Sequence, residues 1–95
     1  QDEDATVRRT VTFALGKIGK DAVPALIQAL QDQDPEVRWY AAGALGSIRS
    51  KNAVPALIQA LQDHDEDVRW NALEALGQIG TPEALKAVEE YQSQQ

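Results

Sequence analysis

The sequence contains no cysteine. This absence excludes disulfides, thiolate metal sites and a cysteine nucleophile. Aromatic residues make up only 5% of the chain although hydrophobic residues make up 43%, so most apolar side chains are small or aliphatic ones that let helices pack closely. No apolar run approaches the roughly 20 residues that a membrane-spanning helix needs, and no signal-peptide pattern opens the chain. We therefore expect a cytoplasmic protein that makes no contact with a membrane.

Methionine is absent as well, and the chain begins Gln-Asp-Glu-Asp. We therefore expect either a processed chain or, in preference, a piece of a longer protein. The chain of 95 residues is predicted to form a single domain, 1–95. A domain of this size has little room for an enclosed catalytic cavity, so we expect no enzymatic activity and no cofactor.

The net charge of −6 is concentrated at one end of the chain. Residues 63–95 carry eight acids and two bases, whereas the two preceding thirds are balanced. A nucleic-acid partner would require a continuous basic stripe that displaces counterions, and the sequence has none. The same balance of charges argues against binding to anionic membranes. Nucleic acid and membrane are therefore not expected as partners.

A long identical repeat dominates the sequence. Residues 22–32 read Ala-Val-Pro-Ala-Leu-Ile-Gln-Ala-Leu-Gln-Asp, and residues 53–63 read the same, 31 positions later. The stretch before each copy also repeats: a Val-Arg pair is followed by Ala-Leu-Gly and then by Ile18, Ile48 or Ile79. Identity at a fixed period is the signature of a repeat architecture. We place the repeats at about 4–31, 34–62 and 65–92.

Each repeat is predicted to form two helices. The first helix should span 4–18, 34–48 and 65–79, because its apolar residues recur with the period of a helix, as in Val37, Ala41, Ala44, Leu45 and Ile48. An aspartate precedes each of these helices and is expected to cap it: Asp4, Asp34 and Asp65. At the Ala-Leu-Gly step, helices are expected to approach closely.

The second helix should start near Ala22, Ala53 and Glu83, and in the first two repeats it has a proline in its first turn, where proline is tolerated. The third copy is more polar, as a terminal repeat requires. Two such helices cannot bury their apolar stripes alone, so about three repeats must stack to share a core.

The pattern Asp-x-x-Val-Arg, Ala-Leu-Gly-x-Ile and Ala-Val-Pro-x-Leu-Ile-x-x-Leu-x-Asp resembles the HEAT-like repeat of phycobilisome lyase subunits. The resemblance covers nearly the whole chain. It implies an all-α fold, an α-solenoid (α–α superhelix) of three HEAT-like helical hairpins. It also implies that the Val-Arg helices line the concave side and that the Ala-Val-Pro helices lie outside.

Known chemistries of the wider group were compared with the sequence. Deoxyhypusine hydroxylase binds iron through His-Glu pairs, but the corresponding pairs here are Arg9-Thr10, Trp39-Tyr40 and Trp70-Asn71, so that activity is rejected. Without cysteine, the chain would be only an accessory part of an epoxyqueuosine reductase. A subunit or fragment of a phycobilin lyase or isomerase stays open.

The polar residues favour structural roles. His64 is the only histidine and lies in an acidic stretch that we interpret as a solvated turn between repeats. Asp-x-Asp pairs recur at 2/4, 32/34 and 63/65, and catalytic residues have no reason to recur with a scaffold. We predict that these aspartates cap helices and pair with Arg8, Arg38 and Arg69 in a ladder between neighbouring repeats.

The Val-Arg helices also carry residues that change between repeats on the side away from the predicted core. Large aromatic side chains at water-facing positions need an explanation. They favour binding, and the alternative is that the rings only cover the adjacent helix. Trp39 and Trp70 are expected to form a short indole ladder. The candidate partner-binding residues are Arg9, Phe13, Lys17, Trp39, Tyr40, Trp70, Asn71 and Glu74.

The sequence thus favours a protein–protein interaction module that binds an unknown protein partner on the concave face. The alternatives are the bilin lyase subunit and a structural spacer within a larger bacterial sensor or scaffold. Weak self-association through bare solenoid ends is also expected.

Overall fold

The computed structural model describes residues 4–95, and over that range the regular structure is entirely helical. The α-helices are α1 (Ala5–Ile18), α2 (Val23–Ala29), α3 (Pro35–Ile48), α4 (Val54–Ala60), α5 (Glu66–Ile79) and α6 (Pro82–Ser93). Short 3₁₀ turns, η1 (Lys20–Ala22) and η2 (Lys51–Ala53), precede α2 and α4. The all-α solenoid predicted from the sequence is confirmed. None of the described helices is both long and apolar enough to cross a membrane.

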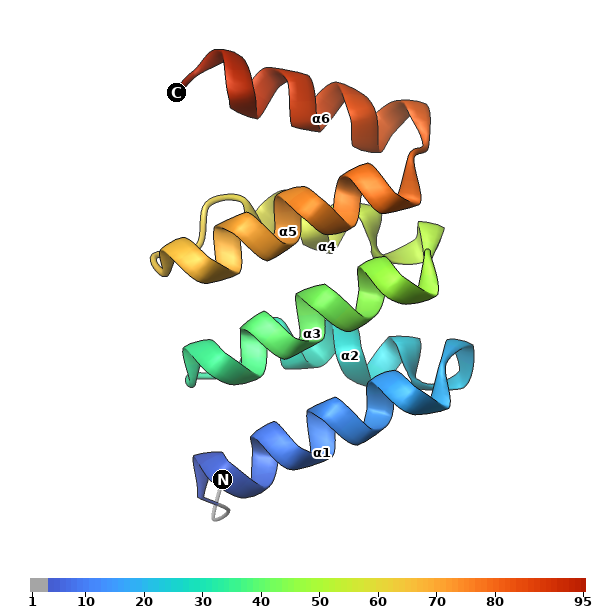
Figure 1. Ribbon diagram of the computed structural model, residues 1–95, viewed down its shortest axis with the longest axis vertical. Coiled ribbons are helices and arrows are strands. Elements are labelled where there is room, and N and C mark those ends of the chain that lie inside the picture. The colour runs from blue at the N-terminus through green and yellow to red at the C-terminus, as the bar shows by residue number, and fades with distance from the viewer. Residues whose placement is uncertain (1–3) are drawn as a thin grey trace.

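The helices form two layers. The first helices of the repeats, α1, α3 and α5, lie side by side in one layer, and α2 and α4 lie behind them (Figure 1). The stack measures 39 × 27 × 14 Å, with the N- and C-terminal ends at opposite ends of its long axis. Neighbouring first helices pack extensively, whereas α2 and α4 barely touch each other. This spacing favours α1–α3–α5 as the inner layer of a curved stack.

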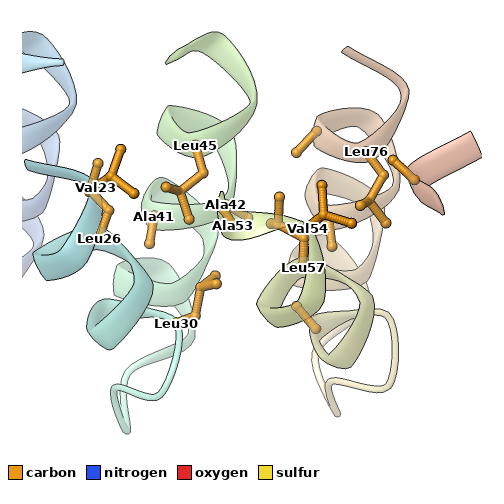
Figure 2. Packing of buried hydrophobic residues seen from close by; sticks show 14 of the residues in the cluster. Val23, Leu26, Leu30, Ala41, Ala42, Leu45, Ala53, Val54, Leu57 and Leu76 are labelled. Atoms are coloured by element: carbon orange, nitrogen blue, oxygen red, sulfur yellow. The ribbon is translucent and has the colours of Figure 1, made fainter. Parts of the chain in front are cut away.

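Contacts between repeats, more than contacts within them, hold the stack together. α2 packs more extensively on α3 than on α1, and α4 packs on α5. Their stripes meet the first helices in one core, where Leu26, Leu45, Leu57 and Leu76 are fully buried (Figure 2). A single hairpin therefore leaves most of its apolar surface uncovered, which is why several repeats must fold together.

Two glycines set the distance between the first helices. A Cβ atom added at Gly46 in α3 would lie 2.7 Å from the Cα and 2.8 Å from the Cβ of Ala75 in α5. One added at Gly16 in α1 would lie 3.0 Å from the Cβ of Ala44 in α3. The close approach predicted at the Ala-Leu-Gly step is confirmed at both places. Gly77 is the glycine of the third Ala-Leu-Gly step, and a Cβ atom added there would have no neighbouring atom within 4 Å.

The outer face of α1 lacks a covering helix among the described residues. Val37 and Ala41 of α3 are 1% and 0% exposed, whereas Val7 and Val11 at the same places in α1 are 47% and 51% exposed. In the second and third repeats the first helix packs against the second helix of the preceding repeat, α3 against α2 and α5 against α4. The predicted bare N-terminal flank is therefore confirmed, while self-association there stays a prediction.

The predicted caps are present. Asp4, Asp34 and Asp65 each accept a hydrogen bond from a backbone N–H in the first turn of their helix. Arg49 adopts the left-handed conformation in which glycine ends the equivalent helix at Gly80. Its Nη1 donates to the carbonyl of Gln78 at 3.1 Å. The arginine thus binds the carboxyl end of α5, where a positive charge is favourable.

The second helices start close to the predicted places. α2 and α4 begin one residue after Ala22 and Ala53, which belong to the 3₁₀ turns. The third begins at Pro82, one residue before Glu83, because Thr81 caps it by accepting a hydrogen bond from the backbone of Ala84.

The glycine pattern gives a matched test of the packing. We expect Gly46→Ala to lower the free energy of unfolding by about 1–3 kcal/mol, because the methyl group overpacks the α3–α5 contact. Gly77→Ala should instead raise it by up to about 1 kcal/mol, because alanine favours the helix and the space is open. Chemical denaturation of both variants measures the difference. Equal effects would contradict the assigned contact.

Candidate functional site

A groove of about 370 Å³ on the α1–α3–α5 face brings together five of the predicted binding residues. It is lined by Phe13 and Lys17 from α1, Trp39 and Tyr40 from α3, and Asn71 from α5. Gly16 and Gly43 also line it, and their lack of side chains keeps the floor open. Residues from three consecutive repeats thus meet in one place.

The aromatic rings form a chain of edge contacts along the groove. The ring centroids of Phe13 and Tyr40 are 5.8 Å apart, and those of Tyr40 and Trp39 are 5.0 Å apart. Such edge-to-face pairs are favourable beyond the area they bury. The ammonium of Lys17 lies 5.0 Å from the centroid of Phe13, in a cation–π arrangement. Since Phe13 is 54% exposed, its ring is available for contact with another molecule.

Asn71 fixes the far wall of the groove. Its side-chain amide donates to the backbone carbonyl of Trp39 at 3.1 Å, which ties α5 to α3. A side chain at Gly43 would crowd that amide, since a Cβ there would lie 3.3 Å from it. The asparagine is thus a positioning residue of the groove.

Two predicted residues lie elsewhere, and the predicted indole ladder is wrong. Among residues 4–95, the ring contacts join Phe13, Tyr40 and Trp39, and none joins two indoles. Trp70 lies in a different groove, between α5 and α6, where it is 60% exposed. Trp39 turns instead toward Tyr40, its neighbour in α3. Glu74 is exposed on α5 and does not line the aromatic groove.

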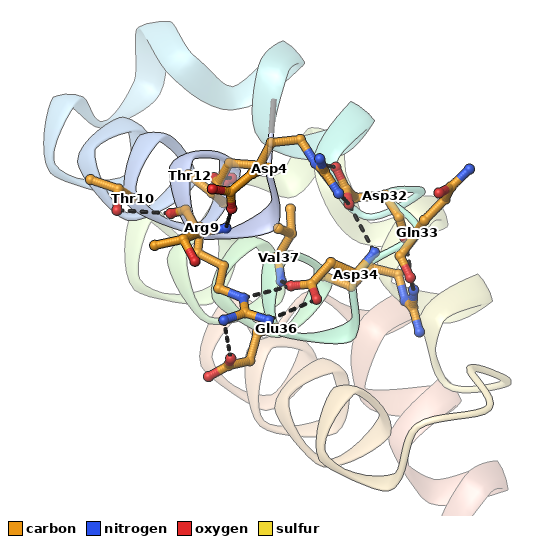
Figure 3. A network of polar contacts seen from close by, with 12 residues as sticks. Asp4, Arg9, Thr10, Thr12, Asp32, Gln33, Asp34, Glu36 and Val37 are labelled. Atoms are coloured by element: carbon orange, nitrogen blue, oxygen red, sulfur yellow. Dashed lines mark hydrogen bonds and ion pairs between the residues drawn. The ribbon is translucent and has the colours of Figure 1, made fainter. Parts of the chain in front are cut away.

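Arg9 has a partner that the sequence did not reveal. Its guanidinium makes a bidentate pair with Asp34, at 2.9 and 3.0 Å, and a second ion pair with Glu36 at 3.1 Å (Figure 3). Its charge is therefore neutralised within the stack. Arg9 and Trp39 line a smaller groove of about 290 Å³, so the arginine borders the aromatic groove without lining it.

The predicted Asp–Arg ladder is confirmed for two of its three arginines. Arg8 binds Asp32 bidentately at 2.9 and 3.2 Å, and Arg38 binds Asp63 at 2.8 and 3.0 Å. Asp32 and Asp63 also accept a hydrogen bond from the backbone N–H two residues on, in the turn between repeats. Arg69 is different: it donates to backbone carbonyls and to no carboxylate among the described residues. Asp2 lies outside the described residues.

The ion pairs change how readily the aspartates are protonated. The hydrogen bond from Arg9 is the main reason why the pKa of Asp34 falls to about 2, and the backbone N–H of Val37 adds to it. Burial alone would raise the pKa of Asp32 and of Asp63. The hydrogen bonds from Arg8 and Arg38, the backbone N–H bonds of Asp34 and Asp65 and the charge of the arginines together outweigh that effect and hold both pKa values below the ordinary one.

The groove supplies aromatic, cationic and amide groups. Among residues 4–95, no cluster of three or more histidine, aspartate and glutamate side chains is placed to hold a metal ion. His64 lies in the turn before α5, as predicted, and lines a separate groove together with Arg38 and Asp63.

Comparison with known protein families shows to which family the chain belongs. The family model of HEAT repeats matches residues 1–51 and again residues 23–94. The chain belongs to the HEAT repeat family. HEAT repeats are commonly protein-interaction scaffolds and are generally not enzymes. Comparison with curated proteins finds no match.

We expect the HEAT stack to lose stability in acid. The folded pKa of Asp34 is about 2, below the ordinary value of 3.8. A lowered folded pKa stabilises the fold above the ordinary pKa, and this contribution is lost as the pH falls from about 4 to about 2. The free energy of unfolding of Asp34→Asn, from urea denaturation at each pH, should therefore depend less steeply on pH than that of the wild type. Asp21→Asn, at an exposed position, should keep the wild-type slope, and identical slopes for all three proteins would refute the assignment.

Proposed function

We propose that this HEAT repeat stack binds a protein partner through the aromatic groove formed by Phe13, Lys17, Trp39, Tyr40 and Asn71. The proposal rests on one observation above all. The five binding residues of the groove stand at positions that differ between repeats, whereas the positions that hold the scaffold, including Gly16 and Ala44 on the floor of the groove, repeat. The scaffold thus presents a set of side chains that its own packing pattern does not require.

The residue types and their exposure suit an apolar segment of a partner. Aromatic side chains dominate the binding energy of interfaces, especially where they line a pocket. Here the rings are held by edge contacts before any partner arrives, so less conformational freedom is lost on binding. Lys17 supplies a positive charge at the α1 end of the groove. Arg9 does not add to it, because its charge is already neutralised by Asp34 and Glu36. We therefore expect the partner to insert an apolar side chain, with a polar or acidic group toward α1.

An alternative ligand for the same groove follows from the type of HEAT repeat. The repeat pattern supports the phycobilisome lyase type of HEAT-like repeat, in which the same groove would hold a bilin or its apoprotein. A volume of about 370 Å³ is at the low end for small-molecule pockets, which favours a protein side chain. A saturable shift of visible absorbance on adding a bilin would support the lyase assignment instead.

Phe13→Ala gives the cleanest test, because an exposed ring contributes little to the fold. Peptides selected from a displayed library on the wild-type protein should bind Phe13→Ala at least about tenfold more weakly, a loss of about 1.4 kcal/mol. The melting temperature should hardly change. Gln28→Ala and Gln59→Ala, on the exposed sides of α2 and α4, are the matched controls and should bind as the wild type does.

Two outcomes would contradict the proposal. If selected peptides bind Phe13→Ala as well as the wild type, the groove is not the binding site. If selection enriches no peptide, the structural spacer is the better account of the chain.

A further inference from the structure

Arg69 is held in the same pose as Arg38, one repeat earlier. In each case Nη1 donates to the carbonyls six and five residues before it. The distances are 2.7 and 3.1 Å for Arg38, to Asp32 and Gln33, and 2.8 and 3.2 Å for Arg69, to Asp63 and His64. Because these bonds fix the plane of the guanidinium, the opposite edge, Nε and Nη2, is oriented alike in both arginines.

That opposite edge is occupied in the first two repeats and not in the third. Arg8 and Arg38 use Nε and Nη2 to bind the aspartate that follows the second helix, Asp32 or Asp63. Nε and Nη2 of Arg69 have no hydrogen-bond partner within residues 4–95. The matching places at the end of α6 hold Ser93 and Gln94, which carry no carboxylate, and the hydroxyl of Ser93 donates to the carbonyl of Glu90.

Arg69 belongs to a groove that also has apolar side chains in its walls. This groove has a volume of about 510 Å³ and lies between α5 and α6. These two helices form the C-terminal end of the stack (Figure 1). Trp70, Leu73 and Tyr91 line it too, and the indole is 60% exposed. An arginine held in the pose that binds a carboxylate elsewhere in the stack thus lines the same groove as an aromatic surface that is open to solvent.

We propose that the α5–α6 groove binds a peptide segment carrying one aspartate or glutamate beside an apolar side chain. The carboxylate binds Nε and Nη2 of Arg69 in the bidentate geometry that Arg8 and Arg38 show. The apolar side chain packs on Trp70, Leu73 and Tyr91. This site is separate from the aromatic groove on the α1–α3–α5 face, so each stands or fails independently.

The surrounding charges limit the ligand to a single acid. Glu66 and Asp67 line the same groove and repel a polyacidic segment. They do not prevent one bidentate pair, because Arg38 binds Asp63 although Glu36 occupies the place that Asp67 has in the third repeat. Bidentate arginine–carboxylate pairs are among the strong hydrogen-bonded contacts, and a preset guanidinium loses little freedom in forming one.

The chain itself supplies the probe. Ala-Leu-Gln-Asp ends each of the two identical copies, at 29–32 and 60–63, and its aspartate is the one that Arg8 and Arg38 hold. The peptide acetyl-Ala-Leu-Gln-Asp-amide is titrated into the whole ¹⁵N-labelled chain, and the arginine Nε–H resonances are followed by NMR. We expect a saturable shift of the Arg69 resonance. The Asp→Asn peptide should bind at least about tenfold more weakly, because it cannot form the charged pair.

Two variants separate binding from folding. Trp70→Ala leaves the arginine in place and removes an exposed wall, so it should weaken binding of the aspartate peptide severalfold with an unchanged melting temperature. Lys17→Ala, in the other groove, should leave this binding unchanged. The proposal is overturned if the Arg69 resonance shows no saturable shift up to the solubility limit of the peptide. It is equally overturned if the aspartate and asparagine peptides bind alike, a comparison that requires no change to the protein.

Discussion

The close approach of α1, α3 and α5 is the constraint on which the other features depend. Glycine at 16 and 46 lets each first helix lie almost directly on the next, and a side chain at Gly46 would collide with Ala75 and with the amide oxygen of Gln78. At this spacing, the arginines of one repeat reach the aspartates of the turn that leads into the next. The same spacing brings Phe13 of α1 within ring contact of Tyr40 of α3. Backbone packing, the ion-pair ladder and the aromatic groove therefore share one cause.

The features that recur with the period were predictable from the sequence. The helix caps at Asp4, Asp34 and Asp65 follow from local hydrogen bonding, which depends on a few neighbouring residues. The core stripe follows from the helical period, and comparison of repeats separated scaffold positions from variable ones. Five residues of the aromatic groove were identified in this way, because a position that the scaffold does not require stands out against a repeating background.

The features that depend on a neighbour's identity were not predictable. Arg9 looked available for a partner, but its position beside Asp34 and Glu36 depends on the lateral register of α1 and α3, which no local pattern encodes. Trp70 occupies the same place in its repeat as Trp39, yet Trp39 packs on Tyr40, whereas in the third repeat Asn71 follows the indole. Its surroundings then depend on α6, which is longer than α2 and α4 and more polar.

The packing of each second helix on the following repeat has a consequence for how the protein opens. All extensive helix contacts join elements of the same repeat or of neighbouring ones, so no long-range closure ties the two ends together. In such a chain, stability is approximately a sum over nearest-neighbour contacts, and the ends separate first. α1 has only one neighbouring first helix, α3, whereas α3 lies between two. α1 can therefore detach while α3, α4 and α5 stay folded, and its amide hydrogens exchange with solvent sooner than those around Leu45 and Leu57.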